Sequence, residues 1–281
     1  MKNFLKTVWN VLKYLLVHFG LQIVYIFGIS FVIGIKIGLE GGADNLDNFD
    51  AEFASTMSAH IPISLIFAGV GSLLIYKWMV NRKGDSFLEV CRFNKLSLDK
   101  SVVSFIAGMS LLYLSSVIVG FFPDEAIDSH VENMSSLTEG GVLLFFLAAG
   151  IMAPLIEEVI FRGLIFKELR GKVSIFAVIL IQALLFGFYH LNLVQGAYTF
   201  VMGVFLGISL LWTGSIWAPI LIHAGNNIFS IGLSVMPFGH FFEQSAVALI
   251  GLFIVLPVSV WYLYKNRMPF ADNYGKPNLK G

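Results

Sequence analysis

The stretch from Pro154 to Gly163 reads Pro-Leu-Ile-Glu-Glu-Val-Ile-Phe-Arg-Gly and ends a long apolar run that begins at Val142. It places three ionisable side chains, Glu157, Glu158 and Arg162, where a charge costs roughly 2.5–3.5 kcal/mol on membrane-insertion scales. On an α-helix Glu158 and Arg162 are four residues apart and share a face, so they can pair. Glu157 points about 100° away from Glu158. We therefore expect one carboxylate in an ion pair and one left for chemistry.

The composition is that of an integral membrane protein. Of 281 residues, 57% are hydrophobic and 13% are charged, whereas a soluble domain carries about 25% charged residues. The formal net charge is zero, so nothing in the charge balance suggests a nucleic-acid partner. The single cysteine, Cys91, excludes an intramolecular disulfide and a zinc site built from several thiolates.

Apolar runs of about 20 residues, long enough to span a bilayer, recur along the chain. They are residues 14–39, 59–80, 101–122, 142–166, 174–191, 193–213, 216–236 and 244–264. The first run is too long for the apolar region of a signal peptide, so we interpret it as a retained span. Lipid permits only helices or closed barrels, and these runs lack the alternation of a barrel. The sequence predicts an all-α polytopic membrane protein of about eight transmembrane helices with a polar catalytic cavity.

The charged residues divide between alternate loops. All Lys and Arg residues except Lys36 lie in the N-terminus, the second loop, the region of the fourth loop or the C-terminal tail. The intervening loops are acidic, with clusters over residues 40–52 and 124–139 and a single acid at Glu243. By the positive-inside rule both termini are expected in the cytoplasm, and an even number of spans agrees. Two glycine pairs, Gly34–Gly38 and Gly203–Gly207, have the spacing of close helix contacts, a weak signal in a chain with 27 glycines.

Two later spans carry histidine. His190 ends the stretch Phe186-Gly-Phe-Tyr-His, and His223 is followed one helical turn later by Asn227. A lone histidine in a span more often makes a helix–helix hydrogen bond than it catalyses. Apart from these residues and the three on the fourth span, the spans hold almost no ionisable residues, so we expect these groups to share one polar cavity. We assign no function to His18, His60, His130 and His240.

Two chemistries fit these residues. In the first, a glutamate beside a histidine activates a water molecule for attack on a peptide carbonyl, and a second histidine and an asparagine amide donate hydrogen bonds to the oxyanion. In the second, Glu157, His190 and His223 are the three ligands of a catalytic zinc. We favour the metal-free account, because the three candidate ligands come from different helices and Asn227 is a good amide donor but a poor zinc ligand.

The motifs resemble those of a known family. Glu157-Glu158-x-x-x-Arg162, Phe186-x-x-x-His190 and His223-x-x-x-Asn227 are similar to the three motifs of the CAAX-protease and bacteriocin-processing (CPBP or Abi) membrane family, of the CAAX prenyl protease 2 type. The resemblance covers about residues 140–235. It implies an eight-helix intramembrane endopeptidase in which Glu157 and His190 activate water, His223 and Asn227 form the oxyanion site, and Glu158 and Arg162 support them. Bacterial members are also linked to bacteriocin immunity.

The resemblance organises the chain into three parts. Residues 1–140 hold N-terminal spans and loops without a family motif, residues 141–236 form the catalytic membrane core, and residues 237–281 hold the last span and a cytoplasmic tail. We expect cleavage of a membrane-associated peptide or protein, of CAAX or bacteriocin type, in a bacterial plasma membrane. Two alternatives use the same residues differently: a non-catalytic immunity or scaffold protein, and a transporter with a proton relay. The transporter is disfavoured because no inverted repeat is recognisable.

The charge distribution gives a test of orientation. A cysteine introduced near Asn48 is expected to react with a membrane-impermeant thiol reagent added to intact cells, and one near Lys83 is not. The reverse labelling pattern would contradict the orientation.

Overall fold

The computed structural model describes residues 2–41, 46–136, 141–235 and 246–268, and every regular element in these ranges is a helix. The first half of the chain forms α1 (Lys2–Gly41), α2 (Leu46–Asn81), α3 (Phe87–Val90), α4 (Leu98–Val119) and α5 (Asp124–Ser136). One continuous helix follows, made of α6 (Val142–Phe145), η1 (Phe146–Met152), α7 (Ala153–Glu158), η2 (Val159–Ile165) and α8 (Phe166–Leu169). The remaining helices are α9 (Ile175–Tyr189), α10 (Leu193–Thr213), α11 (Trp217–Val235), α13 (Ala246–Ile250), η3 (Gly251–Val255) and α14 (Leu256–Lys265).

The predicted all-α membrane fold is confirmed. In the described part of the chain, seven helical stretches are long and apolar enough to cross a membrane. The predicted count of about eight differs by one helix, α9, which has 15 residues and is therefore about 22 Å long. It ends at His190, after which Leu191 takes a left-handed backbone conformation with φ of 53° that stops the helix. The protein is thus an integral membrane protein with multiple spans.

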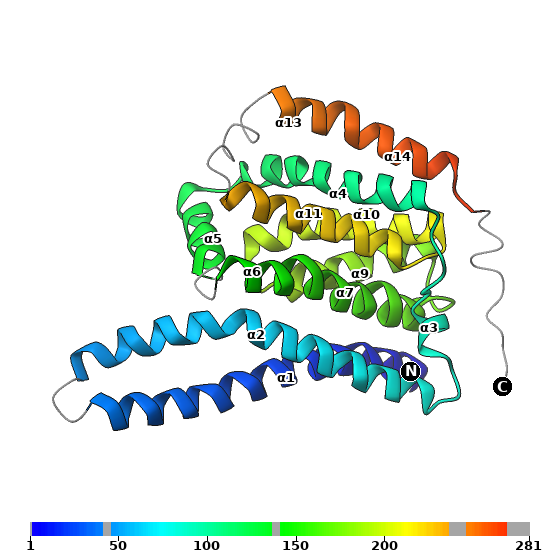
Figure 1. Ribbon diagram of the computed structural model, residues 1–281. Helices are drawn as coiled ribbons and strands as arrows, with labels where there is room; N and C mark the ends of the chain where they lie inside the picture. Colours follow the sequence, from blue (N-terminus) through cyan, green and yellow to red (C-terminus); the bar gives the residue numbers. More distant parts are fainter. Residues whose placement is uncertain (1, 42–45, 137–140, 236–245, 269–281) are drawn as a thin grey trace.

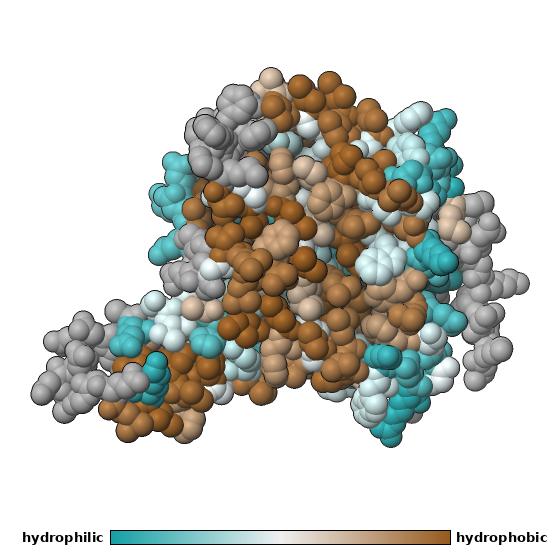
Figure 2. Space-filling model, in the orientation of Figure 1, coloured by the Kyte–Doolittle hydropathy of each residue, from teal (hydrophilic) through white to brown (hydrophobic). Residues whose placement is uncertain are grey.

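The helices pack around the segment that carries the acidic motif (Figure 1). The α1–α2 hairpin lies on one side and extends beyond the other helices, and α4, α9, α10 and α11 lie on the other. In the space-filling view, apolar side chains cover the middle of the visible face and hydrophilic side chains gather towards its ends (Figure 2). This pattern is the one expected of a protein whose middle faces hydrocarbon.

The α6–α8 helix is not a regular α-helix. Two seven-residue π-helical segments, η1 and η2, flank the six residues of α7 that hold Glu157 and Glu158. In a π-helix each amide bonds to the carbonyl five residues earlier, and such segments occur frequently at functional sites. Pro154 lies at the start of α7, where the hydrogen-bonding register changes.

Glycine lets α4 and α11 approach closely. A methyl group added at Gly108 would lie 1.9 Å from the carbonyl oxygen of Ile222, and one added at Gly225 would lie 2.3 Å from that of Phe105. Neither glycine belongs to the two pairs noted in the sequence. Of those pairs, Gly203–Gly207 lies against side chains of the site, whereas a methyl group at Gly34 or Gly38 would meet nothing within 4 Å.

The helix boundaries depart from the sequence analysis in two places. α1 begins at Lys2 rather than near residue 14, because apolar residues such as Phe4, Leu5 and Trp9 alternate with polar ones there and continue the same helix. The acidic segment after α4 forms a helix, α5, which packs on α10. Acidic residues in its first turn stabilise its N-terminus, a signal that the sequence analysis read only as loop charge. His240 and Glu243 lie outside the described residues.

The α4–α11 contact predicts a large effect from a small change. Gly108→Ala is expected to lower the free energy of unfolding by about 1–3 kcal/mol, because the added methyl group forces the two backbones apart. The matched control is Gly28→Ala in α1, where the methyl group meets nothing within 4 Å and helix propensity favours alanine. Unfolding of the purified variants in detergent measures both. Equal stability of the two variants would contradict this packing.

Candidate active site

The centre of the site is a buried ion pair on the acidic motif. Arg162 Nη1 donates to Glu158 Oε1 at 3.0 Å, and both side chains are fully buried. Arg162 Nη2 donates to the backbone carbonyl of Gly203 on α10 at 3.1 Å. The guanidinium also lies over the ring of Phe186, 4.4 Å from its centroid, in a cation–π contact. The pairing is the one expected from the four-residue spacing.

His223 lies between the two glutamates and is hydrogen-bonded to Glu158. Its Nδ1 lies 3.0 Å from Glu158 Oε1, and its Nε2 lies 3.8 Å from Glu157 Oε2. Because a carboxylate only accepts hydrogen bonds, Nδ1 is the donor towards an ionised Glu158, and this fixes the tautomer of the neutral ring. Nε2 is therefore the atom directed at Glu157. His223 is 2% exposed and Glu157 is 8% exposed, so the contact is nearly closed to bulk solvent.

The charges of this cluster can be counted. Glu157, Glu158 and Arg162 alone would leave a net negative charge in a buried site, and a buried uncompensated charge is strongly unfavourable. One further proton, on Glu157 or on His223 Nε2, would make the four side chains neutral overall. The two arrangements of that proton are Glu157 ionised beside a His223 imidazolium, and a protonated Glu157 beside neutral His223.

His190 is held separately, by Phe186. Its Nδ1 donates to the backbone carbonyl of Phe186 at 2.8 Å, which leaves Nε2 as the acceptor of the neutral ring. The Phe186 ring lies edge-on to both histidines, with centroids 5.0 Å from His190 and 5.6 Å from His223. Phe186 therefore contacts His190, His223 and Arg162, which explains why an aromatic residue one turn before His190 suits this site.

Asn227 is tied to the acidic helix by its amide. Nδ2 donates to the backbone carbonyl of Ala149 in η1 at 2.8 Å, which leaves the second Nδ2 hydrogen for another acceptor. Asn227 lies one turn after His223 on α11. The six residues singled out in the sequence thus form a cluster of four, Glu157, Glu158, Arg162 and His223, with His190 linked through Phe186 and Asn227 linked through η1.

Sequence reasoning missed Gln182. It is fully buried on α9, and its Nε2 donates to the carbonyls of Gly203 at 2.9 Å and Ile179 at 2.8 Å. Gly203 thus accepts from both Gln182 and Arg162. A methyl group at Gly207 would lie 2.8 Å from Gln182 Nε2, and one at Gly203 would lie 3.2 Å from Arg162 Nη2. The glycine pair therefore makes room for two polar side chains, and a glutamine amid an apolar span was the available signal.

The histidines given no function make local contacts. His18 Nδ1 lies 3.0 Å from Ser72 Oγ, and His60 Nδ1 lies 3.0 Å from Tyr25 Oη, each a hydrogen bond between α1 and α2. His130 on α5 lies edge-on to Tyr198 with centroids 5.9 Å apart, and burial lowers its pKa. These contacts are structural.

Cys91 is also excluded as a nucleophile. It is fully buried at the end of α3, where its sulfur fills the space beside Gly163. Burial raises the pKa of its thiol to about 12, so the thiolate needed for nucleophilic attack is not populated at neutral pH. The native cysteine therefore does not compete with cysteines introduced to test orientation.

The geometry bears on the predicted zinc ligands Glu157, His190 and His223. Within residues 2–41, 46–136, 141–235 and 246–268, no group of three or more His, Cys, Asp or Glu side chains is placed to hold a metal ion. One ring nitrogen of His223 is already bonded to Glu158, and the other faces Glu157. The trio of Glu157, His190 and His223 therefore does not form a three-ligand site here, and no catalytic step is assigned to zinc.

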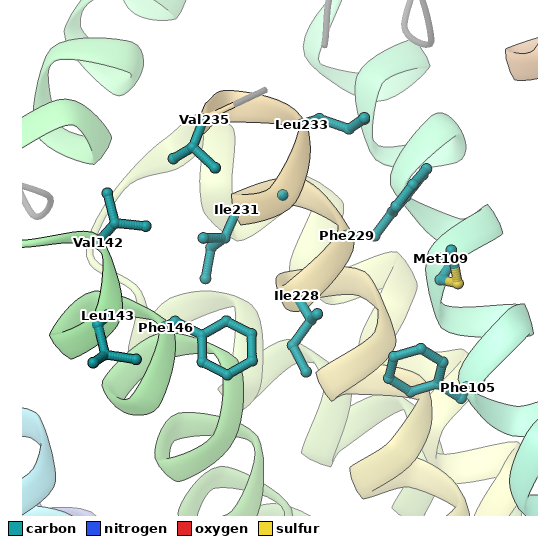
Figure 3. A pocket seen from close by; sticks show the side chains of 11 residues that line it. Phe105, Met109, Val142, Leu143, Phe146, Ile228, Phe229, Ile231, Leu233 and Val235 are labelled. Carbon is teal, nitrogen blue, oxygen red and sulfur yellow. The ribbon is translucent and has the colours of Figure 1, made fainter. Parts of the chain in front are cut away.

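An apolar cavity lies beside the polar cluster. It has a volume of about 600 Å³ and lies between the N-terminal part of the acidic helix, α4 and the end of α11 (Figure 3). All of its lining is apolar: Phe105, Met109, Val142, Leu143, Phe146, Ile228, Phe229, Ile231, Gly232, Leu233 and Val235. Ile228 directly follows Asn227, so the cavity adjoins the Asn227 end of the site.

Taken together, the helices and the cluster define a polytopic membrane protein with a buried site of two glutamates, an arginine and two histidines. Residues 139–229 match the sequence profile of the Rce1-like type II CAAX prenyl endopeptidases. The part of this chain that carries the three motifs is therefore similar to the Rce1-like (CPBP) family of membrane CAAX proteases, as the motifs predict.

Two relatives are similar to this chain. A Bacillus subtilis protein described as a candidate membrane peptidase, YdiL, is 28% identical over 159 residues, which are 55% of this chain and 65% of YdiL. The membrane-embedded CAAX protease MroQ of Staphylococcus aureus is 23% identical over 179 residues, which are 61% of this chain and 72% of MroQ. The match thus spans just under two thirds of YdiL. No solved structure gives a significant match.

The buried pair makes a clear stability prediction. Arg162→Ala is expected to lower the free energy of unfolding by about 3–5 kcal/mol, because it leaves Glu158 as an uncompensated buried charge. The control is Lys172→Ala, which breaks an exposed ion pair with Glu168 and is expected to cost about 0–1 kcal/mol. Chemical unfolding in detergent measures the free energy of unfolding of both variants. Similar decreases for the two would show that the buried pair stabilises the fold no more than the exposed one.

Proposed function

We propose that this protein is an intramembrane endopeptidase that hydrolyses a peptide bond of a membrane-associated substrate without a covalent intermediate. The observation that carries the proposal is His223 lying between Glu157 and Glu158 in a buried cluster. A packing histidine would need one partner. A ring with one nitrogen fixed by a carboxylate and the other directed at a second carboxylate suits proton transfer.

In this mechanism Glu157 and His190 activate the water molecule. Ionised Glu157 takes a proton from a water molecule, whose oxygen attacks the carbonyl carbon of the scissile bond. His190 Nε2 accepts a hydrogen bond from the same water, since its Nδ1 is committed to the Phe186 carbonyl. Glu157 then passes the proton to the leaving amine nitrogen. The atoms balance, because water supplies the hydroxyl of the new acid and the hydrogen of the new amine.

In the same mechanism His223 and Asn227 stabilise the oxyanion. When the further proton is on His223, Glu157 is ionised and Nε2 is a donor, so one arrangement of the proton provides both base and oxyanion donor. Asn227 adds its second Nδ2 hydrogen. Glu158 and Arg162 hold the His223 ring in place. The apolar cavity beside Asn227 suits apolar groups of a substrate.

The test is cleavage of a membrane-peptide library by the purified protein. Glu157→Gln is expected to abolish cleavage while leaving the melting temperature near that of the wild type, because the base is lost and the shape is kept. Glu52→Gln, at an exposed position on α2, is the matched control and should leave cleavage unchanged. Full activity of Glu157→Gln would rule out Glu157 as the base, whereas no cleavage by the wild type would favour a scaffold or immunity role.

A second measurement addresses the metal. Elemental analysis of active protein is expected to find no stoichiometric zinc, and a chelator is expected to leave the cleavage rate unchanged, since the base is a carboxylate. Loss of activity with chelator and recovery with added zinc would overturn the metal-free mechanism.

A further inference from the structure

The hydrogen bond of Asn227 depends on an interruption in the acidic helix. At the end of η1 the amide of Ala153 donates to the carbonyl of Ala148, five residues earlier. In the same register the next amide, that of residue 154, would donate to the carbonyl of Ala149. Residue 154 is proline, which has no amide hydrogen. Pro154 therefore withholds the donor that a π-helical register would direct to Ala149.

The side chain of Asn227 supplies the donor instead. Its Nδ2 reaches the Ala149 oxygen from α11 at 2.8 Å. In a membrane interior a backbone carbonyl without a partner is costly, and side chains of neighbouring helices commonly satisfy groups that a proline frees. The approach is close because Gly150 has no side chain: a methyl group there would lie 3.1 Å from Ile228 Cγ1.

We propose that Pro154 is a positioning residue for Asn227: by withholding its amide hydrogen, it reserves the Ala149 carbonyl for the Asn227 amide and so fixes that amide within the site. The alternative is a purely local role, in which Pro154 only starts α7. The first turn of any helix accommodates proline. The two accounts differ in what a restored amide hydrogen does. With alanine at position 154, the π-helical register gives Ala149 a backbone donor, the amide of residue 154, and the carbonyl no longer needs Asn227.

A double-mutant cycle on stability tests this coupling without relying on activity. In the wild-type background, Asn227→Ala is expected to lower the folding equilibrium constant about 3- to 15-fold, the range of hydrogen bonds between membrane helices. In the Pro154→Ala background the same substitution is expected to change it less than about 2-fold. The loss of side-chain packing is common to both backgrounds and cancels. Additive effects of the two substitutions would overturn the proposal, and Pro154→Gly restores the same hydrogen should Pro154→Ala fail to fold.

The catalytic consequence rests on the proposed function. Pro154→Ala keeps every polar side chain of the site, yet is expected to lower kcat about 10-fold or more with little change in KM, because a misplaced oxyanion donor acts on the transition state. The control is Pro62→Ala, which restores an amide inside α2 and should leave kcat unchanged. An unchanged kcat in Pro154→Ala would remove the catalytic part of the proposal. If the wild type cleaves nothing, the proposed function fails, and the stability cycle still decides the structural part.

Discussion

The structure depends on keeping a set of buried charges neutral. Glu157, Glu158 and Arg162 lie within one membrane helix, and the Glu158–Arg162 pair has no exposed side-chain surface. Two carboxylates and one guanidinium do not balance, and a proton on Glu157 or on the neighbouring His223 would balance them. Hydrophobic residues of similar volume would often stabilise a fold at least as well as a buried ion pair. The retention of these charges is therefore better explained by chemistry than by stability.

Unusual backbone features in the surrounding helices accommodate this cluster. Two π-helical segments bracket the glutamates, and glycines on α10 admit the side chains of Arg162 and Gln182. Phe186 contacts the guanidinium and both histidine rings and also provides the carbonyl that fixes the tautomer of His190. These features raise the cost of folding locally, which is typical of functional sites.

Much of this site could be predicted from the sequence. Burial of a carboxylate four residues before an arginine predicts the ion pair, and the scarcity of polar groups elsewhere in the spans predicts that His223 joins it. The link from His223 to both glutamates could not be predicted, since it depends on how α11 rotates against α7. The Asn227–Ala149 bond was missed because it depends on a π-helical register, which no residue pattern specifies. The helix α5 was missed because its acidic first turn resembles a loop.

Charge neutrality is tested most directly by changing both partners of the buried pair. Arg162→Met alone leaves a carboxylate uncompensated, whereas Arg162→Met combined with Glu158→Gln removes one charge of each sign and keeps the cluster neutral. The measurement is the unfolding free energy of the two variants in the same detergent. Neutrality predicts that the double variant is the more stable by several kcal/mol, of the order of the ~3–5 kcal/mol cost of a stranded buried charge. A double variant no more stable than Arg162→Met would show that charge balance does not hold this site together.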